Sequence, residues 1–166
     1  AGVPASLRDQ FTEIERTALE TTEAMHEIVW LLKPGNANLA ELSAHLRETA
    51  AAQLREKQHQ FHLCGDASAR PISIEFTRNV YLVFKEALAN IIKHSGAQAV
   101  VITIAVNGST LDLAICDDGV GFDSAKPPLG NGLENMRRRA AQLGTTLRII
   151  SAPGQGTTIR LAALIR

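Results

Sequence analysis

The sequence predicts an α+β domain, in which helices cover a mixed and mostly antiparallel sheet in two layers, preceded by one long coiled-coil-like helix. Three observations lead to this fold class. Apolar residues recur at helical spacing in several segments of the 166-residue chain, short β-prone runs joined by turns fill the C-terminal half, and Gly-rich stretches separate them. Hydrophobic residues make up 45% and charged residues 20%, which is ordinary for a globular domain.

Charge and cysteine content narrow the class of protein. The 17 basic and 17 acidic residues give a formal net charge of zero, so no long-range field favours nucleic acid or an anionic membrane. No apolar run approaches the ~18 residues of a membrane span. Cys64 and Cys116 lack a metal-type spacing, which indicates a reducing compartment, and we expect a cytoplasmic location. The start at Ala1 suggests a piece of a longer protein, and whether that protein is membrane-anchored stays open.

The first segment predicts a long helix with one narrow apolar stripe. From Leu7 to Leu32 the apolar residues follow a four-three spacing, and Pro34-Gly35 then ends the helix. At ~1.5 Å per residue the helix is about 40 Å long, and so thin a stripe favours partner helices over a globular core. We therefore divide the chain into a helical segment at residues 1–35 and a folded domain at residues 36–166.

Two further helices and one strand are expected before residue 96. Asn38 can cap a helix that ends near Lys57, and a strand follows over Gln58 to Cys64. The strongest helix runs from after Ser73 to His94, where Ser95-Gly96 stops it. Its apolar side comprises Tyr81, Phe84, Leu88, Ile91 and Ile92, and its polar side comprises Glu86, Asn90, Lys93 and His94.

The C-terminal half predicts two hairpins and one helix. Strands at Val100 to Val106 and Leu111 to Asp117 meet through Asn107-Gly108-Ser109, which is typical of a tight turn. A long Gly-rich loop over Asp118 to Gly132 follows, and long loops inside compact domains are usually functional. The remaining elements are a helix from Leu133 to Leu143, and strands at Leu147 to Ser151 and Thr158 to Leu164.

The glycine-rich segments do not match three common sites. The sequence has no G-x-x-x-x-G-K-[ST] segment, which excludes a P-loop nucleotidase. Ser124 replaces the third glycine of a dinucleotide fingerprint that would begin at Gly119. The Asp117-Asp118-Gly119 run lacks the ligand spacing of a calcium loop.

Four ordered elements together indicate a nucleoside triphosphate site. An i, i+4 carboxylate and carboxamide offer oxygens to a magnesium ion, a strand-end carboxylate can accept a hydrogen bond from an exocyclic amine, and a glycine-started helix offers N–H groups to phosphate. The elements are Glu86-x-x-x-Asn90, Asp117-Asp118-Gly119-Val120-Gly121, Gly130-Asn131-Gly132-Leu133 and Gly154-Gln155-Gly156-Thr157.

These elements resemble the conserved boxes of sensor histidine kinases. Residues 84–95 resemble their N box, Asp117 to Phe122 their first glycine box, Gly130 to Arg139 their second, and Gly154 to Thr157 the last. The resemblance covers about residues 7 to 166. It implies the Bergerat ATP-binding sandwich of the GHKL superfamily. The subgroup implied has a short lid, an N box ending in Lys-His and a HisKA_3-type dimerisation hairpin, of which residues 1–35 would be the second helix.

The resemblance also implies roles for individual residues. Asn90 would coordinate Mg²⁺, and Glu86 would polarise the attacking imidazole or a magnesium-bound water. Asp117 would accept a hydrogen bond from the adenine amino group, and Thr157 would bond near that pair. The other ATP-binding residues implied are Lys93 and His94 against phosphate charge, Gly119, Gly121 and Phe122 beside the base, and Gly130, Gly132 and Leu133 at the lid and phosphate end.

The implied reaction transfers the γ-phosphoryl group of ATP to a histidine, for relay to a response regulator. In the family the acceptor lies on the first hairpin helix, in a segment of Arg-x-x-Arg-x-x-His-Asp type that this sequence lacks. His26-Glu27 imitates it only superficially, because it lies close to Pro34 without the preceding basic residues. We expect a homodimer through the N-terminal helix, ATP and Mg²⁺ as cofactors, and no phosphorylation of this fragment by itself.

Three alternatives remain at this point. A serine kinase of the anti-sigma type shares the boxes, although the long N-terminal stripe disfavours it. An ATP-driven clamp related to chaperones or mismatch-repair proteins would use nucleotide binding to close a dimer. A module that has lost nucleotide binding is disfavoured because Asn90, Asp117 and the glycines are present.

Overall fold

A computed structural model describes residues 38–68, 70–123 and 131–165, together with seven helical residues nearer the N-terminus. These seven are Phe11, Ile14, Thr21, Thr22, Met25, Val29 and Trp30. The chain divides into two compact units, Ala1–Asn36 and Ala37–Arg166. Most of the long helix predicted for the first unit, and residues 124–130 of the loop predicted over Asp118 to Gly132, lie outside the described residues.

The second unit contains a five-stranded sheet in the order β1-β2-β3-β5-β4. The strands are β1 (Gln58–Gly65), β2 (Ala99–Asn107), β3 (Thr110–Asp117), β4 (Leu147–Ser151) and β5 (Thr157–Leu164). The β1 strand pairs with β2 in parallel, and the other three pairings are antiparallel. The prediction of a mixed, mostly antiparallel sheet is therefore confirmed.

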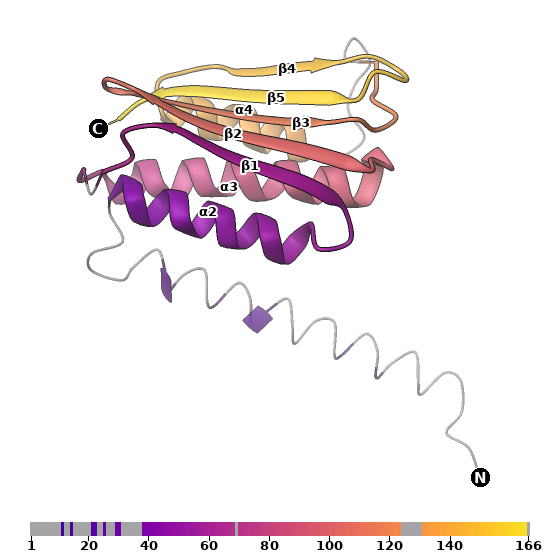
Figure 1. Ribbon diagram of the computed structural model, residues 1–166, viewed down its shortest axis with the longest axis horizontal. Helices are drawn as coiled ribbons and strands as arrows, with labels where there is room; N and C mark the ends of the chain where they lie inside the picture. The colour runs from indigo at the N-terminus through magenta and orange to yellow at the C-terminus, as the bar shows by residue number, and fades with distance from the viewer. Residues whose placement is uncertain are drawn as a thin grey trace. The chain divides into compact units, whose positions relative to one another are not determined.

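Three helices, α2 (Leu39–Gln53), α3 (Ile74–Asn90) and α4 (Gly132–Gln142), lie on one face of the sheet (Figure 1). The predicted cap of α2 is confirmed, because Asn38 Oδ1 accepts a hydrogen bond from the Glu41 N–H at 2.9 Å. Our expectation that α2 reaches Lys57 is wrong. After Gln53 the chain turns back into β1. Lys57, at the end of this turn, donates its Nζ to the carbonyl of Ala97, just before β2, at 2.8 Å.

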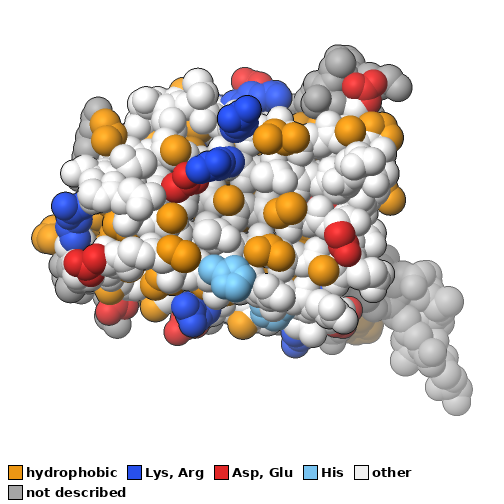
Figure 2. Space-filling view, turned by 45° about the horizontal axis from the view of Figure 1, so that its top comes forward, with side chains coloured by type: hydrophobic (Ala, Val, Ile, Leu, Met, Phe, Trp, Pro, Cys, Tyr) orange, Lys and Arg blue, Asp and Glu red, His pale blue; other side chains and the backbone are white. Residues whose placement is uncertain are grey.

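The core lies between the helices and the sheet. Alternate strand residues enter it, and β2 and β3 contribute Ile102, Ile104, Leu113 and Ile115, each at most 1% exposed. None of the helices described in this unit lies on the opposite face of the sheet, and Figure 2 shows the hydrophobic side chains of that face scattered among polar ones. Among the described residues, no helix combines the length and apolar character that crossing a bilayer requires.

A π-helical turn, η1 (Ile91–Ser95), extends α3, and Gly96 with a φ of 61° follows it. The turn accounts for one wrong prediction. Ile92 was expected on the apolar side of the helix, but its side chain is 44% exposed, whereas Leu88 one turn earlier is fully buried. A π turn holds more residues than an α turn, so the residues after Asn90 leave the α-helical register.

Asp118 joins the end of β3 to the start of β2. Its Oδ1 accepts hydrogen bonds from the backbone N–H groups of Gln98 and Ala99, both at 2.9 Å. These bonds favour the ionised form, and the hydrogen bond from Ala99 is the largest cause that lowers the Asp118 pKa below its usual 3.8. Asp118 is thus a structural acceptor, although it stands next to a predicted binding residue.

Replacing Asp118 with Ala should lower the free energy of unfolding at neutral pH, because two strand-end N–H groups lose their acceptor. The pKa of Asp118 in the folded protein lies below 3.8. The difference in free energy of unfolding between variant and wild type should therefore be present above pH 3.8 and vanish as the pH falls through that folded pKa. Urea unfolding at several pH values measures it, with Glu56→Ala as an exposed-carboxylate control. An equal loss at pH 7 and at pH 2 would contradict this assignment.

Candidate functional site

A row of polar side chains closes one end of the core. Asp117 on β3 pairs directly with Thr157 on β5, and Thr157 pairs with Ser151 on β4. Strand alternation puts all three on the helix-covered face, in line with the buried Ile115 and Ile159. Directly opposed residues of antiparallel strands have Cβ atoms about 5 Å apart, so the sheet register alone brings these groups together.

Asp117 is a buried carboxyl group, only 5% exposed. Its Oδ1 accepts a hydrogen bond from the Gly119 N–H at 2.9 Å, and the backbone of Thr157 also donates to it. Burial nevertheless dominates and raises the Asp117 pKa above its usual 3.8. The carboxylate therefore has unfilled acceptor capacity, and its desolvation makes a further donor favourable.

Ser151 is a residue of the site that sequence reasoning missed. Its Oγ accepts a hydrogen bond from the Phe122 N–H at 2.9 Å, donates to the Gly156 carbonyl at 3.0 Å, and lies 3.0 Å from Thr157 Oγ1. It thus joins the predicted first and last glycine segments. The alternation of Leu147, Ile149 and Ser151 could have indicated a polar group on the core face.

Two glycines permit close packing between these segments. At Gly121 (φ 58°) a Cβ would collide with the Ala152 carbonyl oxygen, and at Gly156 (φ 68°) it would collide with the carbonyl oxygen of Asp117. Both positions combine a left-handed backbone with contact against another backbone, which only glycine allows without strain. The Gly154 N–H completes the junction by donating to the Val120 carbonyl at 2.6 Å.

The end of η1 joins the first glycine segment to the long helix. The Ser95 carbonyl accepts a hydrogen bond from the Val120 N–H at 2.8 Å, and a Cβ at Gly119 would collide with that same carbonyl oxygen. Ser95 Oγ holds the turn itself, since it donates to Ile91 O at 2.7 Å and accepts from the Ala97 N–H at 3.0 Å. Lys93 and His94 lie on this turn and are exposed.

The start of α4 lies against the polar side of α3. A Cβ at Gly132 would collide with Glu86 Oε1 and would lie 3.7 Å from Asn90 Oδ1. The predicted second glycine segment therefore meets the predicted carboxylate and carboxamide. The Asn90 Nδ2 atom is buried and has no hydrogen-bond partner among the described residues, which leaves this side chain with unused bonding capacity inside the site.

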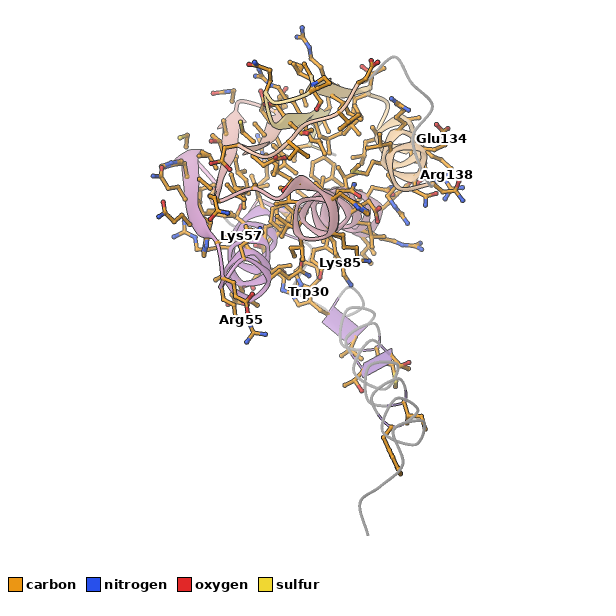
Figure 3. The ribbon with its side chains drawn as sticks, turned by 90° about the vertical axis from the view of Figure 1, so that its right-hand side faces the viewer. Trp30, Arg55, Lys57, Lys85, Glu134 and Arg138 are labelled. Atoms are coloured by element: carbon orange, nitrogen blue, oxygen red, sulfur yellow. The ribbon has the colours of Figure 1, made fainter. Side chains whose placement is uncertain are left out.

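The first turn of α4 has no side-chain cap among the described residues. Its N-cap residue, Asn131, makes no side-chain cap hydrogen bond, so the N–H groups around Gly132 and Leu133 are not capped by it. Farther along α4, Arg138 donates to Asn135 Oδ1 at 3.1 Å, and Arg138 and Glu134 point outward (Figure 3). The arginine run therefore presents mainly a solvated face, as its sequence suggests.

The structure gathers most of the predicted site residues into two connected groups. The first comprises Asp117, Gly119, Gly121, Phe122 and Thr157, and the second comprises Glu86, Asn90, Gly132 and Leu133. Lys93 and His94 stand on η1, which links the two groups through Ser95. Gly130 lies outside the described residues.

The two groups offer different chemistry. The Asp117 group presents hydrogen-bond acceptors, which suit an exocyclic amine. The Glu86 and Asn90 group presents oxygens beside a helix N-terminus, which suit a divalent cation and phosphate. The described residues contain no cluster of three or more His, Cys, Asp or Glu side chains arranged for a metal, but Mg²⁺ commonly needs only one or two protein ligands when phosphate oxygens supply the rest.

Comparisons with known proteins agree with this arrangement. Residues 77–165, more than half of the chain, match the family described as histidine kinase-, DNA gyrase B-, and HSP90-like ATPase. The chain is similar to the sensor histidine kinase LiaS of Bacillus subtilis, with 28% identity over 149 residues that cover 89% of this chain and 41% of LiaS. It is also 28% identical over 161 residues to the sensor protein VraS of Staphylococcus haemolyticus, covering 96% of this chain and 45% of VraS.

The chain thus spans less than half the length of these two relatives. Solved structures show the same fold. The histidine kinase AdeS of Acinetobacter baumannii superposes with a TM-score of 0.64 at 15% identity, covering 100% of this chain and 87% of that one. The histidine kinase domain of the blue-light activated kinase EL346 from Erythrobacter litoralis gives a TM-score of 0.60 at 21% identity, with coverage of 75% and 61%.

Membership of an ATPase family implies that the domain binds ATP. The matched range contains β2 to β5, α4, most of α3 and the residues of the site, whereas α2 and β1 precede it. The chain belongs to the histidine kinase-, DNA gyrase B-, and HSP90-like ATPase family.

Proposed function

We propose that this chain is the ATP-binding catalytic part of a two-component sensor histidine kinase, of the subgroup with a HisKA_3-type dimerisation hairpin. The observation that carries the proposal is the contact of Gly132 with Glu86 and Asn90, joined through η1 to the Asp117 group. Four segments distant in sequence thereby form one site with an amine-accepting end and a phosphate-binding end. The similarity to LiaS and VraS, both named as sensor proteins, supports the same function.

At the base end, Asp117 accepts a hydrogen bond from the amino group of adenine. Its burial supports this role, because a desolvated carboxylate gains more from a donor than an exposed one does. Gly119, Gly121 and Phe122 supply the backbone beside the base, and the Thr157 hydroxyl lies next to the Asp117 carboxylate.

At the phosphate end, Asn90 is the protein ligand of Mg²⁺, which neutralises phosphate charge when bound. The side-chain oxygens of Asn90 and Glu86, which both lie beside Gly132, fit such an ion. The buried Asn90 Nδ2, which has no hydrogen-bond partner among the described residues, can donate to a phosphate oxygen. The N–H groups at Gly132 and Leu133, with Lys93 and His94, stabilise the phosphate oxygens.

The reaction is the transfer of the ATP γ-phosphoryl group to a histidine nitrogen of the dimerisation hairpin. The nitrogen forms a bond to the γ-phosphorus while the bond from that phosphorus to the bridging oxygen breaks, and ADP leaves. Glu86 polarises the attacking imidazole, and positioning and charge neutralisation provide most of the rate.

Residues 1–35 form the second helix of the dimerisation hairpin in this proposal, and residues 36–166 form the catalytic domain. The seam residues Phe11, Ile14 and Met25 are 59%, 63% and 62% exposed, which supports partner helices in the intact homodimer. The acceptor histidine lies on a helix upstream of residue 1, and a response regulator receives the phosphoryl group from it.

Replacing Asp117 with Asn should weaken ATP binding, because the amide cannot offer the base the same charged acceptor. We expect a loss of about 1–3 kcal/mol, which is about 5- to 150-fold in Kd, by titration calorimetry with Mg-ATP. Glu134→Ala, an exposed change on α4, is the control. An unchanged Kd for Asp117→Asn would remove the base assignment.

The same Asp117→Asn variant should differ from the wild type in pH dependence. A carboxyl whose folded pKa is raised favours folding below the unfolded value of 3.8 and loses that contribution as the pH rises through the folded pKa. Asn does not titrate. As the pH rises from 3.8 to the folded pKa of Asp117, the variant should therefore become more stable relative to the wild type. Urea unfolding from pH 3 to 7 measures this, and a change in the opposite direction contradicts the burial argument.

Replacing Gly132 with Ala should slow phosphoryl transfer more than it weakens ATP binding. The new methyl group displaces the Glu86 carboxylate, which has a flexible side chain, so the fold tolerates it. A misplacement of about 1 Å can cost about a hundredfold in rate. Single-turnover transfer, compared with the Kd for ATP and with Glu134→Ala, measures the difference. Equal losses in the rate of phosphoryl transfer and in the affinity for ATP would contradict the role of Glu86.

Mixing this chain with a separate segment that carries the acceptor histidine tests the overall reaction. With γ-labelled Mg-ATP, the chain alone should remain unlabelled, and an added segment carrying the upstream histidine helix should acquire acid-labile phosphate. A chain with His26→Gln should label that segment equally well. Phosphohistidine on His26 would overturn the acceptor assignment. Acid-stable phosphoserine on a partner would indicate a kinase of the anti-sigma type instead.

A further inference from the structure

The hydroxyl groups of Ser151 and Thr157 have a defined hydrogen-bond direction. A serine hydroxyl has one proton to donate and two lone pairs to accept. A carbonyl oxygen can only accept, so the Ser151 proton must point to Gly156 O, 3.0 Å away. A backbone N–H can only donate, so one Ser151 lone pair receives the Phe122 N–H.

The remaining contact therefore has only one possible donor. With the Ser151 proton already used, the 3.0 Å bond between the two hydroxyls must be donated by Thr157. Its proton then points at Ser151, away from other groups, and its oxygen keeps its lone pairs. The Thr157 hydroxyl is thus held as an acceptor.

The polarity of Thr157 matters because Asp117 is its direct cross-strand partner on the same face of the sheet. The Asp117 carboxylate and the Thr157 hydroxyl, whose proton is already donated to Ser151, together form an edge of hydrogen-bond acceptors. At the 6-position, a 6-aminopurine presents two protons to such an edge, whereas a 6-oxopurine presents another acceptor there. A site that presents acceptors to a donor group rejects a base with an acceptor at that position, because buried polar groups are then left unpaired.

We infer that Ser151 is a positioning residue for nucleotide selection: it holds the Thr157 hydroxyl as an acceptor and so makes the site favour 6-aminopurine over 6-oxopurine triphosphates. Ser151 does not touch the nucleotide in this arrangement and acts through Thr157. The inference rests on the proposed function, since it assumes that the base lies beside Asp117.

The test compares Mg-ATP with Mg-ITP, which differs at the purine 6-position, where the amino group is replaced by an oxo group with a proton on N1. We expect the wild type to prefer ATP. In Ser151→Ala the Thr157 proton is free to turn and donate to the oxo group. The Kd for ITP divided by the Kd for ATP should therefore fall about three- to tenfold. Ser43→Ala, which removes a buried hydroxyl that donates to Leu39 O on α2, is the matched control and should leave the ratio unchanged.

A double-mutant cycle separates positioning from a general structural effect. Thr157→Val removes the hydroxyl on which Ser151 acts, so it should reduce the ratio by itself, and Ser151→Ala should add no further change in that background. If Ser151→Ala lowers the ratio equally in both backgrounds, Ser151 acts only by holding the loops and the inference is wrong. The cycle remains informative if one variant loses stability, because it compares ratios measured within each protein.

Two failures are distinguishable. If the wild type binds neither nucleotide, the proposed function itself fails. If it binds ATP but shows no preference over ITP, the inference fails while ATP binding stands. If Ser151→Ala leaves the preference intact, only the assignment to Ser151 and Thr157 fails, and Asp117 remains the residue that selects the base.

Discussion

The pairing register of β3, β5 and β4 is the constraint on which the site depends. It puts Asp117, Thr157 and Ser151 side by side on the helix-covered face, at the end of rows of isoleucine and leucine. A slip of one residue would move each of them to the opposite face and remove the anchor of two glycine segments. The apolar rows make that slip unfavourable, so the packing of the core also determines the geometry of the polar groups.

The second end of the site depends on packing between helices. Gly132 allows α4 to begin against Glu86 and Asn90, and the η1 turn leads from those residues to the Ser95 carbonyl that holds Val120. The α3 helix therefore contributes to both ends of one site. A displacement of α4 would affect the phosphate end first, because the base end is held by strand pairing and by the hydrogen bonds of Ser151.

Local chemistry was enough to predict much of the fold. Asn38 caps its helix and the turn at Asn107-Gly108-Ser109 joins two strands, because such signals act over a few residues. Longer-range features were not predictable in this way. Ser151 bonds Phe122, 29 positions away, and only the strand register reveals it. The exposure of Ile92 follows from a π turn that helical periodicity does not indicate. Asp117 and Asp118 are alike in sequence, yet strand alternation buries the first and leaves the second exposed.

Under the proposed function, the buried Asp117 carboxyl would also link nucleotide occupancy to the lifetime of the protein. Its burial disfavours the charged form, and a ligand amine would compensate for that cost by completing its hydrogen bonds. A ligand that binds only the folded state stabilises it in proportion to the logarithm of its concentration. Molecules without nucleotide are then the fraction that opens most readily to proteases, so the supply of triphosphate in the cell would influence how long each copy survives.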